Sequence, residues 1–348
     1  MNNIVCVTSP VSVGCSFIDW SIHFLSGNSK FYSVKNSAWI PVTDDPLTEI
    51  NAHGHKKNHS SGHDTSWSYI NQLSTLPKNE LVSVYPFPLH ADIVAQKIGI
   101  AGDLTPEKLK QLKKYQEDDY ANLINSFLDA NINVVYVSLS KKNILYTRKD
   151  RALERLYFKD QIPESFEEAN EHIDQLFFAD SANYWQQHKL TNIWDRRERL
   201  ALCRRPFDTD RLMEGLEFNR TKQYLEINAE SMWYNGKNTI KKIMKFLNID
   251  IDKTTWDHWI NVYYKWQQIQ LDALEFVINV EYIINAIVHN WYYEIDNLTF
   301  EQEVIIQHCL IYQHGLNLKT WQLEKFPSNT QDLHKLLESN IHPVPTIY

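Results

Sequence analysis

Short apolar runs alternate with amphipathic segments along the first two thirds of the chain. Four of these runs are apolar or β-branched over several consecutive positions, which is the pattern of strands buried on both faces of a parallel sheet. They are Ile4–Thr8, Leu81–Tyr85, Asn133–Leu139 and Gln223–Asn228. Strands separated by helical segments predict an α/β domain with a mostly parallel sheet flanked by helices.

Two of the predicted helices carry clear local signals. Leu104–Ala130 begins with Thr105, a good N-cap residue, and Pro106, which suits the first helical position. Asn238–Leu247 has apolar residues at the i, i+3, i+4 and i+7 positions of one face. The other predicted helices are Phe17–Leu25, Ser165–Ala179 and Asn192–Cys203.

The strand pattern disappears after about residue 249. Three segments rich in aromatic residues predict helices there, namely Trp256–Gln270, Leu271–Trp291 and Phe300–His314. We therefore expect an α/β domain over residues 1–248 and a helical C-terminal extension over residues 249–348 that packs on it.

Composition excludes several functional classes. The chain has 35 Lys and Arg against 43 Asp and Glu, a formal net charge of −8, which disfavours binding to nucleic acid or to an anionic membrane. Neither a signal peptide nor a long apolar stretch is visible, so we expect a cytoplasmic protein with no membrane partner. Four widely spaced cysteines form neither a disulfide framework nor a zinc ribbon.

Glycine is scarce, with 9 among 348 residues against a usual ~7%. The motifs GxGxxG, GxxxxGK[ST] and GxSxG are absent, so any phosphate site must be built around a single glycine. Gly14 is the glycine of the turn between the first strand and the first helix. Backbone N–H groups and the helix dipole favour an anion at such a turn, and Ser12 and Ser16 can add hydroxyl donors. An ordinary, serine-capped turn is the alternative.

A second polar segment follows the third predicted strand. Ser140, Lys141 and Arg148 lie there, and ligands of open α/β sheets bind beyond the carboxyl ends of the strands. We therefore expect these side chains to face the same crevice as the first turn. A solvated basic helix face is the alternative interpretation.

Four elements, in this order, resemble the sulfotransferase family. The segment Pro10–Phe17 is similar to the family's loop for the 5′-phosphosulfate of PAPS (3′-phosphoadenosine 5′-phosphosulfate), with one extra residue and no Lys or Arg. Val84–His90 is similar to its strand with a T-H-x-P-like turn. Ser140 and Arg148 match the family's Arg and Ser that hold the 3′-phosphate after the third strand, with the residue types exchanged. Tyr224–Ala229 and Lys242–Ile249 are similar to its Y-E-D-L strand and its helix ending in F-L-G. The chain looks like a divergent member of phage or bacterial type, over residues 4–249.

The resemblance implies a P-loop-like α/β fold and transfer of a sulfuryl group from PAPS to the hydroxyl or amine of a small-molecule or glycan acceptor. The implied cofactor-binding residues lie in the first loop and after the third strand: Ser12, Val13, Gly14, Cys15, Ser16, Ser140 and Arg148. His90, His55 and Glu226 are candidate proton acceptors. Lys56 is a candidate for the cation that the first loop lacks.

Two other functions stay open because of that missing cation. One is a non-catalytic binding or assembly protein with this fold, and the other, less favoured, is a small-molecule P-loop kinase.

A histidine-rich segment raises the separate question of a metal site. His53, His55, His59 and His63 match no zinc signature, so we interpret the segment as a polar loop or a lid and expect no metal.

Overall fold

The computed structural model describes part of the chain in detail. The described residues are 4–9, 14–33, 38–49, 81–84, 97–99, 106–139, 224–295, 298–299, 302–303, 306 and 328–338. The predicted helices Ser165–Ala179 and Asn192–Cys203 lie outside them, as does most of Phe300–His314.

The chain divides into two units, each built from several segments. The first comprises Met1–Val94, Lys113–Ile144 and Pro206–Leu271, and the second comprises Ala95–Leu112, Leu145–Arg205 and Asp272–Tyr348. All strands of the main sheet belong to the first unit. The domain boundary expected after residue 248 stays a prediction.

Four parallel strands form the main sheet, and all four were predicted. They are β1 (Ile4–Thr8), β4 (Val82–Val84), β5 (Asn133–Ser138) and β6 (Tyr224–Asn228), in the order β4-β1-β5-β6. Every neighbouring pair is parallel. Because helices cover both faces of such a sheet, its strands are apolar at consecutive positions, and this is why they could be recognised in the sequence.

A small antiparallel sheet was not predicted. It consists of β2 (Lys30–Ser33) and β3 (Ala38–Pro41), and the 3₁₀ helix η1 (Pro46–Glu49) follows. Each strand has only four residues, too few to show a period. The ammonium group of Lys30 lies 4.6 Å from the centre of the Trp39 ring across this pair.

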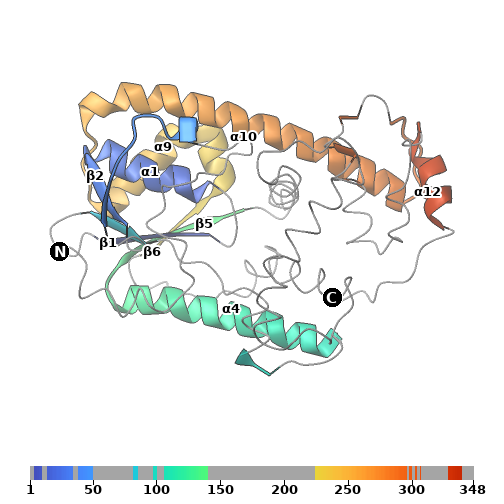
Figure 1. Ribbon diagram of the computed structural model, residues 1–348, viewed down its shortest axis with the longest axis horizontal. Helices are drawn as coiled ribbons and strands as arrows, with labels where there is room; N and C mark the ends of the chain where they lie inside the picture. Colours follow the sequence, from blue (N-terminus) through green and yellow to red (C-terminus); the bar gives the residue numbers. More distant parts are fainter. Residues whose placement is uncertain are drawn as a thin grey trace. The chain divides into compact units, whose positions relative to one another are not determined.

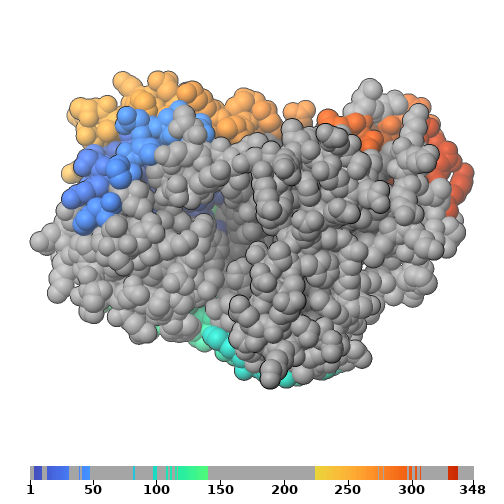
Figure 2. Space-filling view, viewed as in Figure 1, coloured from blue at the N-terminus to red at the C-terminus, as the bar shows by residue number. Residues whose placement is uncertain are grey.

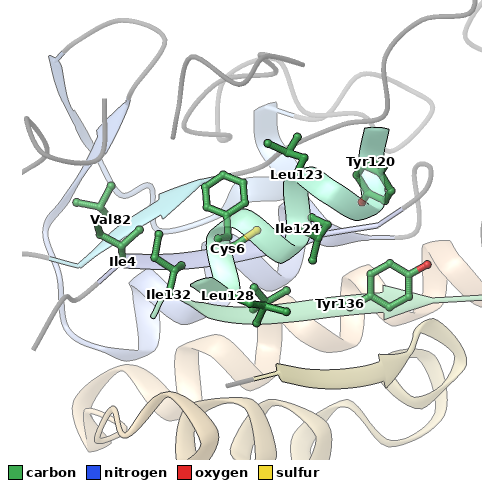
Figure 3. Packing of buried hydrophobic residues seen from close by; sticks show 11 residues of the cluster. Ile4, Cys6, Val82, Tyr120, Leu123, Ile124, Leu128, Ile132 and Tyr136 are labelled. Carbon is green, nitrogen blue, oxygen red and sulfur yellow. The ribbon is translucent and has the colours of Figure 1, made fainter. Parts of the chain in front are cut away.

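One face of the main sheet packs against α4 (Pro106–Asp129), which begins at the predicted proline. Figure 3 shows the core between them: Ile4, Cys6 and Tyr136 of the sheet belong to one buried cluster with Tyr120 and Ile124 of the helix. All of these side chains are buried. Burial of this apolar surface is the main stabilising contribution on this side of the sheet.

The opposite face is covered by α1 (Cys15–Leu25) and α9 (Ala229–Leu247), as Figure 1 shows. The sequence predicted that α1 begins at Phe17, two residues too late, and that α9 begins at Asn238, nine residues too late. In α9 the cause is visible, because Asn235, Gly236 and Asn238 are poor helix formers and hide the first half from a propensity argument. The backbone at Asn235 is non-helical, with φ −144° and ψ 41°.

The long helix α10 (Lys253–Val288) corrects the prediction of two separate helices in this region. Neither glycine nor proline stands near Gln270 and Leu271, where the predicted break lies, so nothing stops the helix there. It ends before Trp291, the predicted end, and Asn290 adopts a left-handed conformation with φ 53°. A shorter helix, α12 (Thr330–Glu338), lies near the C-terminus of the chain.

Aromatic contacts join the first half of α10 to α1. The rings of Phe17 and Trp266 stack with centroids 4.3 Å apart, and the indole N–H of Trp259 donates to Ser21 Oγ at 2.9 Å. In the space-filling view this part of α10 lies at the surface beside the residues that follow β3 (Figure 2), where His258 hydrogen-bonds to the carbonyl of Asp44 at 2.8 Å. Packing against α1 thus accounts for the buried aromatic residues Trp259, Tyr263 and Trp266 of α10.

None of the helices in the described part of the chain is both long and apolar enough to cross a membrane.

Candidate functional site

The predicted strand–turn–helix unit is present at the start of the chain. β1 ends at Thr8, Ser9 is buried beyond it, and α1 begins after Gly14. The carbonyl of Gly14 accepts hydrogen bonds from the backbone N–H groups of Phe17 and Ile18 at 3.0 and 3.1 Å. No side chain caps this helix end. The α1 N-terminus therefore carries its dipole charge at the end of a buried parallel strand.

The predicted loop residues are only partly described. Ser12 and Val13 lie outside the described residues. Cys15 is buried and Ser16 is partly buried. The thiol of Cys15 is thus turned into the protein, so a contact from this residue to an anion would come from its backbone N–H group. Cys6 is buried as well, and burial raises the pKa of its thiol well above the usual value.

Gly14 has a second structural reason to be glycine, which the sequence did not reveal. Its φ of 88° is in the left-handed region, where side chains are strained. A Cβ atom at this position would stand 2.8 Å from the Trp266 ring, which also stacks on Phe17. The bare Cα of Gly14 therefore lets the indole of α10 approach the first turn of α1.

Strand order makes the end of β1 a switch point of the sheet. The chain passes from β1 to β4 on one side and from β5 to β6 on the other, while β1 and β5 are hydrogen-bonded neighbours. Thr8 pairs with Tyr136, so the carboxyl ends of the two strands lie side by side. In open α/β sheets such a crevice is the usual ligand site. Ser140 and Arg148, predicted to face it, lie outside the described residues.

A row of hydroxyl groups lies near this edge on the α4 side. Thr8 Oγ1 hydrogen-bonds to the hydroxyl of Tyr120, and the Tyr136 ring stacks against that of Tyr224 with centroids 6.3 Å apart. Burial raises the pKa of Tyr120 and of Tyr136, and for Tyr136 the neighbouring Tyr224 and Glu226 add to the effect. Both phenols therefore stay protonated at neutral pH, and that of Tyr120 is hydrogen-bonded to Thr8.

Glu226, a predicted proton acceptor, stands at the open end of this row. It lies on β6, pairs in register with Tyr136, and is exposed to solvent. Its Oε2 accepts a hydrogen bond from the Tyr224 hydroxyl at 3.4 Å. An exposed carboxylate next to a phenol is accessible to a substrate and can accept a proton.

The transition from β6 to α9 is tightly capped. The side chain of Asn228 accepts a hydrogen bond from the backbone N–H of Glu230 at 3.0 Å, as an N-cap residue does. Ser138 Oγ donates to the carbonyl of Ile227 at 3.3 Å and ties the ends of β5 and β6 together. The first turns of α9 therefore stand at the same sheet edge as the end of β5.

Sequence reasoning missed a groove on those first turns. It has a volume of about 450 Å³. Each residue that lines it carries a polar group: Glu230, Ser231, Tyr234, Asn235, Asn238, Thr239 and Lys242. The spacing of these polar positions over three turns of helix was the available signal. It was missed because only the second half of α9 was predicted to be helical.

The remaining predicted catalytic residues belong to two segments before α4 in the sequence. His90, His55 and Lys56, together with the rest of the histidine-rich segment, lie outside the described residues. Within the described ranges, no group of three or more His, Cys, Asp and Glu side chains is arranged to hold a metal ion.

An ionisable pair inside α1 was also missed. Asp19 and His23 are both buried, with 3.9 Å between His23 Nε2 and Asp19 Oδ1. Burial lowers the pKa of His23 to about 3, so the imidazole is neutral at neutral pH. The only signal in the sequence was the i, i+4 spacing.

The comparisons with known proteins found no family model that matches the chain and no matching curated protein.

Proposed function

We propose that this chain is a sulfotransferase-like enzyme that moves a sulfuryl group from PAPS to a hydroxyl or amine acceptor. The observation that carries the proposal is the strand order β4-β1-β5-β6, with α1 starting directly after the β1 turn. In this proposal two sequence segments with anion-binding character contribute to the crevice at the carboxyl ends of β1 and β5. One is the turn before α1, and the other follows β5.

The described part of the crevice fits an anionic nucleotide in one respect. The α1 N-terminus begins at a residue without a side chain, so no side chain of the first position competes for its N–H groups. Ser12 and Ser16 would add hydroxyl donors, with backbone donors from Val13, Gly14 and Cys15. In the same proposal Ser140 and Arg148 hold the 3′-phosphate, where the guanidinium gives bidentate contacts.

Chemistry at this site requires charge stabilisation and proton removal. PAPS, when bound, supplies the sulfuryl group, and its S–O bond to the 5′-phosphate breaks as the acceptor oxygen or nitrogen bonds to sulfur. Lys56 stabilises the negative charge that gathers on the leaving phosphate oxygen. His90, His55 or Glu226 accepts the acceptor's proton, and exposed Glu226 beside Tyr224 is the described candidate.

The second candidate is a non-catalytic binding module with the same fold. Two observations favour it: Trp266 packs directly against Gly14, and no acidic or basic residue stands in the first turn of α1. In this alternative the crevice binds a nucleotide but no transfer follows.

Calorimetry with 3′,5′-adenosine diphosphate tests the first proposal. We expect the wild-type protein to bind and Arg148→Ala to bind at least about tenfold more weakly, since a bidentate charged contact is lost. Absence of binding to the wild-type protein contradicts both candidates. Binding without transfer of labelled sulfate from PAPS to any acceptor tested supports the binding module.

A further inference from the structure

The groove on α9 is formed by an irregular turn that other side chains hold in place. At Asn235 the helix leaves its regular path, and the hydroxyl of Tyr263 inserts into the gap. That hydroxyl accepts from Gly236 N–H at 2.9 Å and donates to the Met232 carbonyl at 3.0 Å. These two backbone groups would bond each other in a regular helix.

Two further side chains hydrogen-bond to backbone carbonyls near the kink. Gln267 Nε2 donates to the carbonyl of Trp233, and Thr239 Oγ1 lies 3.0 Å from the carbonyls of both Ser231 and Asn235. The backbone groups released by the kink are thus bonded by α10 and by Thr239. Apart from Thr239, the polar side chains that line the groove are therefore not needed to satisfy the backbone groups at the kink.

Polar groups of the groove form a set suited to hydroxyl-rich ligands. Asn238 Nδ2 donates to Asn235 Oδ1 at 2.9 Å, which leaves donors on the Asn235 amide and an acceptor on the Asn238 amide. Both side chains are exposed. A hydroxyl group needs one donor and one acceptor from its site, and this amide pair presents both.

The charges and the aromatic ring of the groove narrow the class of ligand further. The groove holds one carboxylate, of Glu230, and one ammonium group, of Lys242, so it favours neither a strong anion nor a strong cation. Tyr234 exposes 63% of its surface, and its flat ring can pack against the apolar C–H face of a pyranose. The volume of about 450 Å³ is in the range of small-ligand sites.

We propose that this groove binds a neutral saccharide, with the Tyr234 ring under one sugar face and the Asn235–Asn238 amide pair on its hydroxyls. The inference is independent of the proposed function, because it rests on α9 and α10 alone and needs no nucleotide.

Binding to an array of neutral oligosaccharides of glucose, galactose, mannose and N-acetylhexosamines tests the proposal, followed by calorimetry with the best binder. Tyr234→Ala and Asn238→Ala should each weaken binding about tenfold. Tyr292→Ala is the matched control, since this ring is 61% exposed but belongs to the other unit, and it should bind as the wild type does.

Three results would overturn the proposal. One is absence of binding across the array and in calorimetry at a saccharide concentration of about 10 mM, tenfold above a Kd of about 1 mM. Another is binding that survives both groove substitutions, and the third is binding that Tyr292→Ala abolishes. Loss of 3′,5′-adenosine diphosphate binding would not bear on this groove, so the two proposals fail separately.

Discussion

The hydroxyl of Tyr263 occupies the place of a backbone hydrogen bond beside Gly236. A Cβ atom on Gly236 would stand 2.2 Å from the Tyr263 ring, so the ring reaches the α9 backbone only because this residue has no side chain. The relationship joins α9 to α10 and holds the kink at Asn235. A contact of this kind predicts a specific loss of stability when either partner changes.

Tyr263→Phe should lower the free energy of unfolding by about 1–3 kcal/mol, because a buried N–H and a buried carbonyl lose their partner. Denaturant unfolding followed by tryptophan fluorescence measures the change. Tyr264→Phe is the matched control, since this neighbouring phenol is exposed, and it should change stability by less than about 0.5 kcal/mol. Equal effects of the two substitutions would show that the inserted hydroxyl has no special role.

Gly14→Ala should destabilise the protein more than Gly27→Ala does. Both residues have φ in the left-handed region, 88° and 72°, so both substitutions carry a conformational cost of about 1–2 kcal/mol. At Gly14 the new methyl group also meets the Trp266 ring at 2.8 Å, whereas at Gly27 it meets only the side chain of Asp252, at 3.0 Å. Urea unfolding of the two variants gives the difference.

A double variant separates the contact with Trp266 from the backbone strain at Gly14. Trp266→Leu removes the indole, so in that background Gly14→Ala should approach the smaller cost of Gly27→Ala. An unchanged cost in both backgrounds would mean that Trp266 does not restrict this position.

Stability should fall as the pH is lowered through the window set by His23. In the unfolded chain this imidazole binds a proton below about pH 6.5, whereas in the folded protein its pKa is about 3. Between these values the unfolded state holds the extra proton, so the contribution to stability decreases by up to about 1.4 kcal/mol per pH unit.

His23→Gln removes this titration, so the variant's stability should depend less on pH than that of the wild type between pH 6.5 and 5. Chemical unfolding at several pH values measures both slopes. Parallel curves for the two proteins would contradict the assignment.

The thiols of Cys6 and Cys15 should resist alkylation in the folded protein. Both are buried, and burial raises the pKa of Cys6, which lowers the fraction of reactive thiolate. We expect iodoacetamide to label their peptides only after denaturation, as read by mass spectrometry. Rapid labelling of either residue under native conditions would be inconsistent with the packing of β1 and α1.

Much of the fold could be predicted because burial on both faces leaves a consecutive apolar pattern. Ile4–Thr8 coincides with β1, and the other three strands differ from their predicted runs by one or two residues. Short or irregular elements could not be found this way. The β2–β3 pair is too brief to show a period, and the kink at Asn235 hides the first half of α9 from a propensity argument.

The candidate site was predicted only as far as local motifs reach. Gly14 was singled out as the glycine of the first turn, and the structure places it at the start of α1. Its contact with Trp266 joins residues more than 250 positions apart, for which no local pattern exists. The same holds for the groove, whose support comes from Tyr263 and Gln267 of another helix.

By itself, the sequence determined the strands of the main sheet, their parallel arrangement and the helices α1 and α4, because these follow from hydrophobic period and local capping. Only the tertiary structure decided the strand order that makes the β1 end a switch point. It also decided why Gly14 and Gly236 must be glycine, since each receives an aromatic ring from α10. Such close approaches depend on side chains brought together by folding, and short-range sequence patterns do not record them.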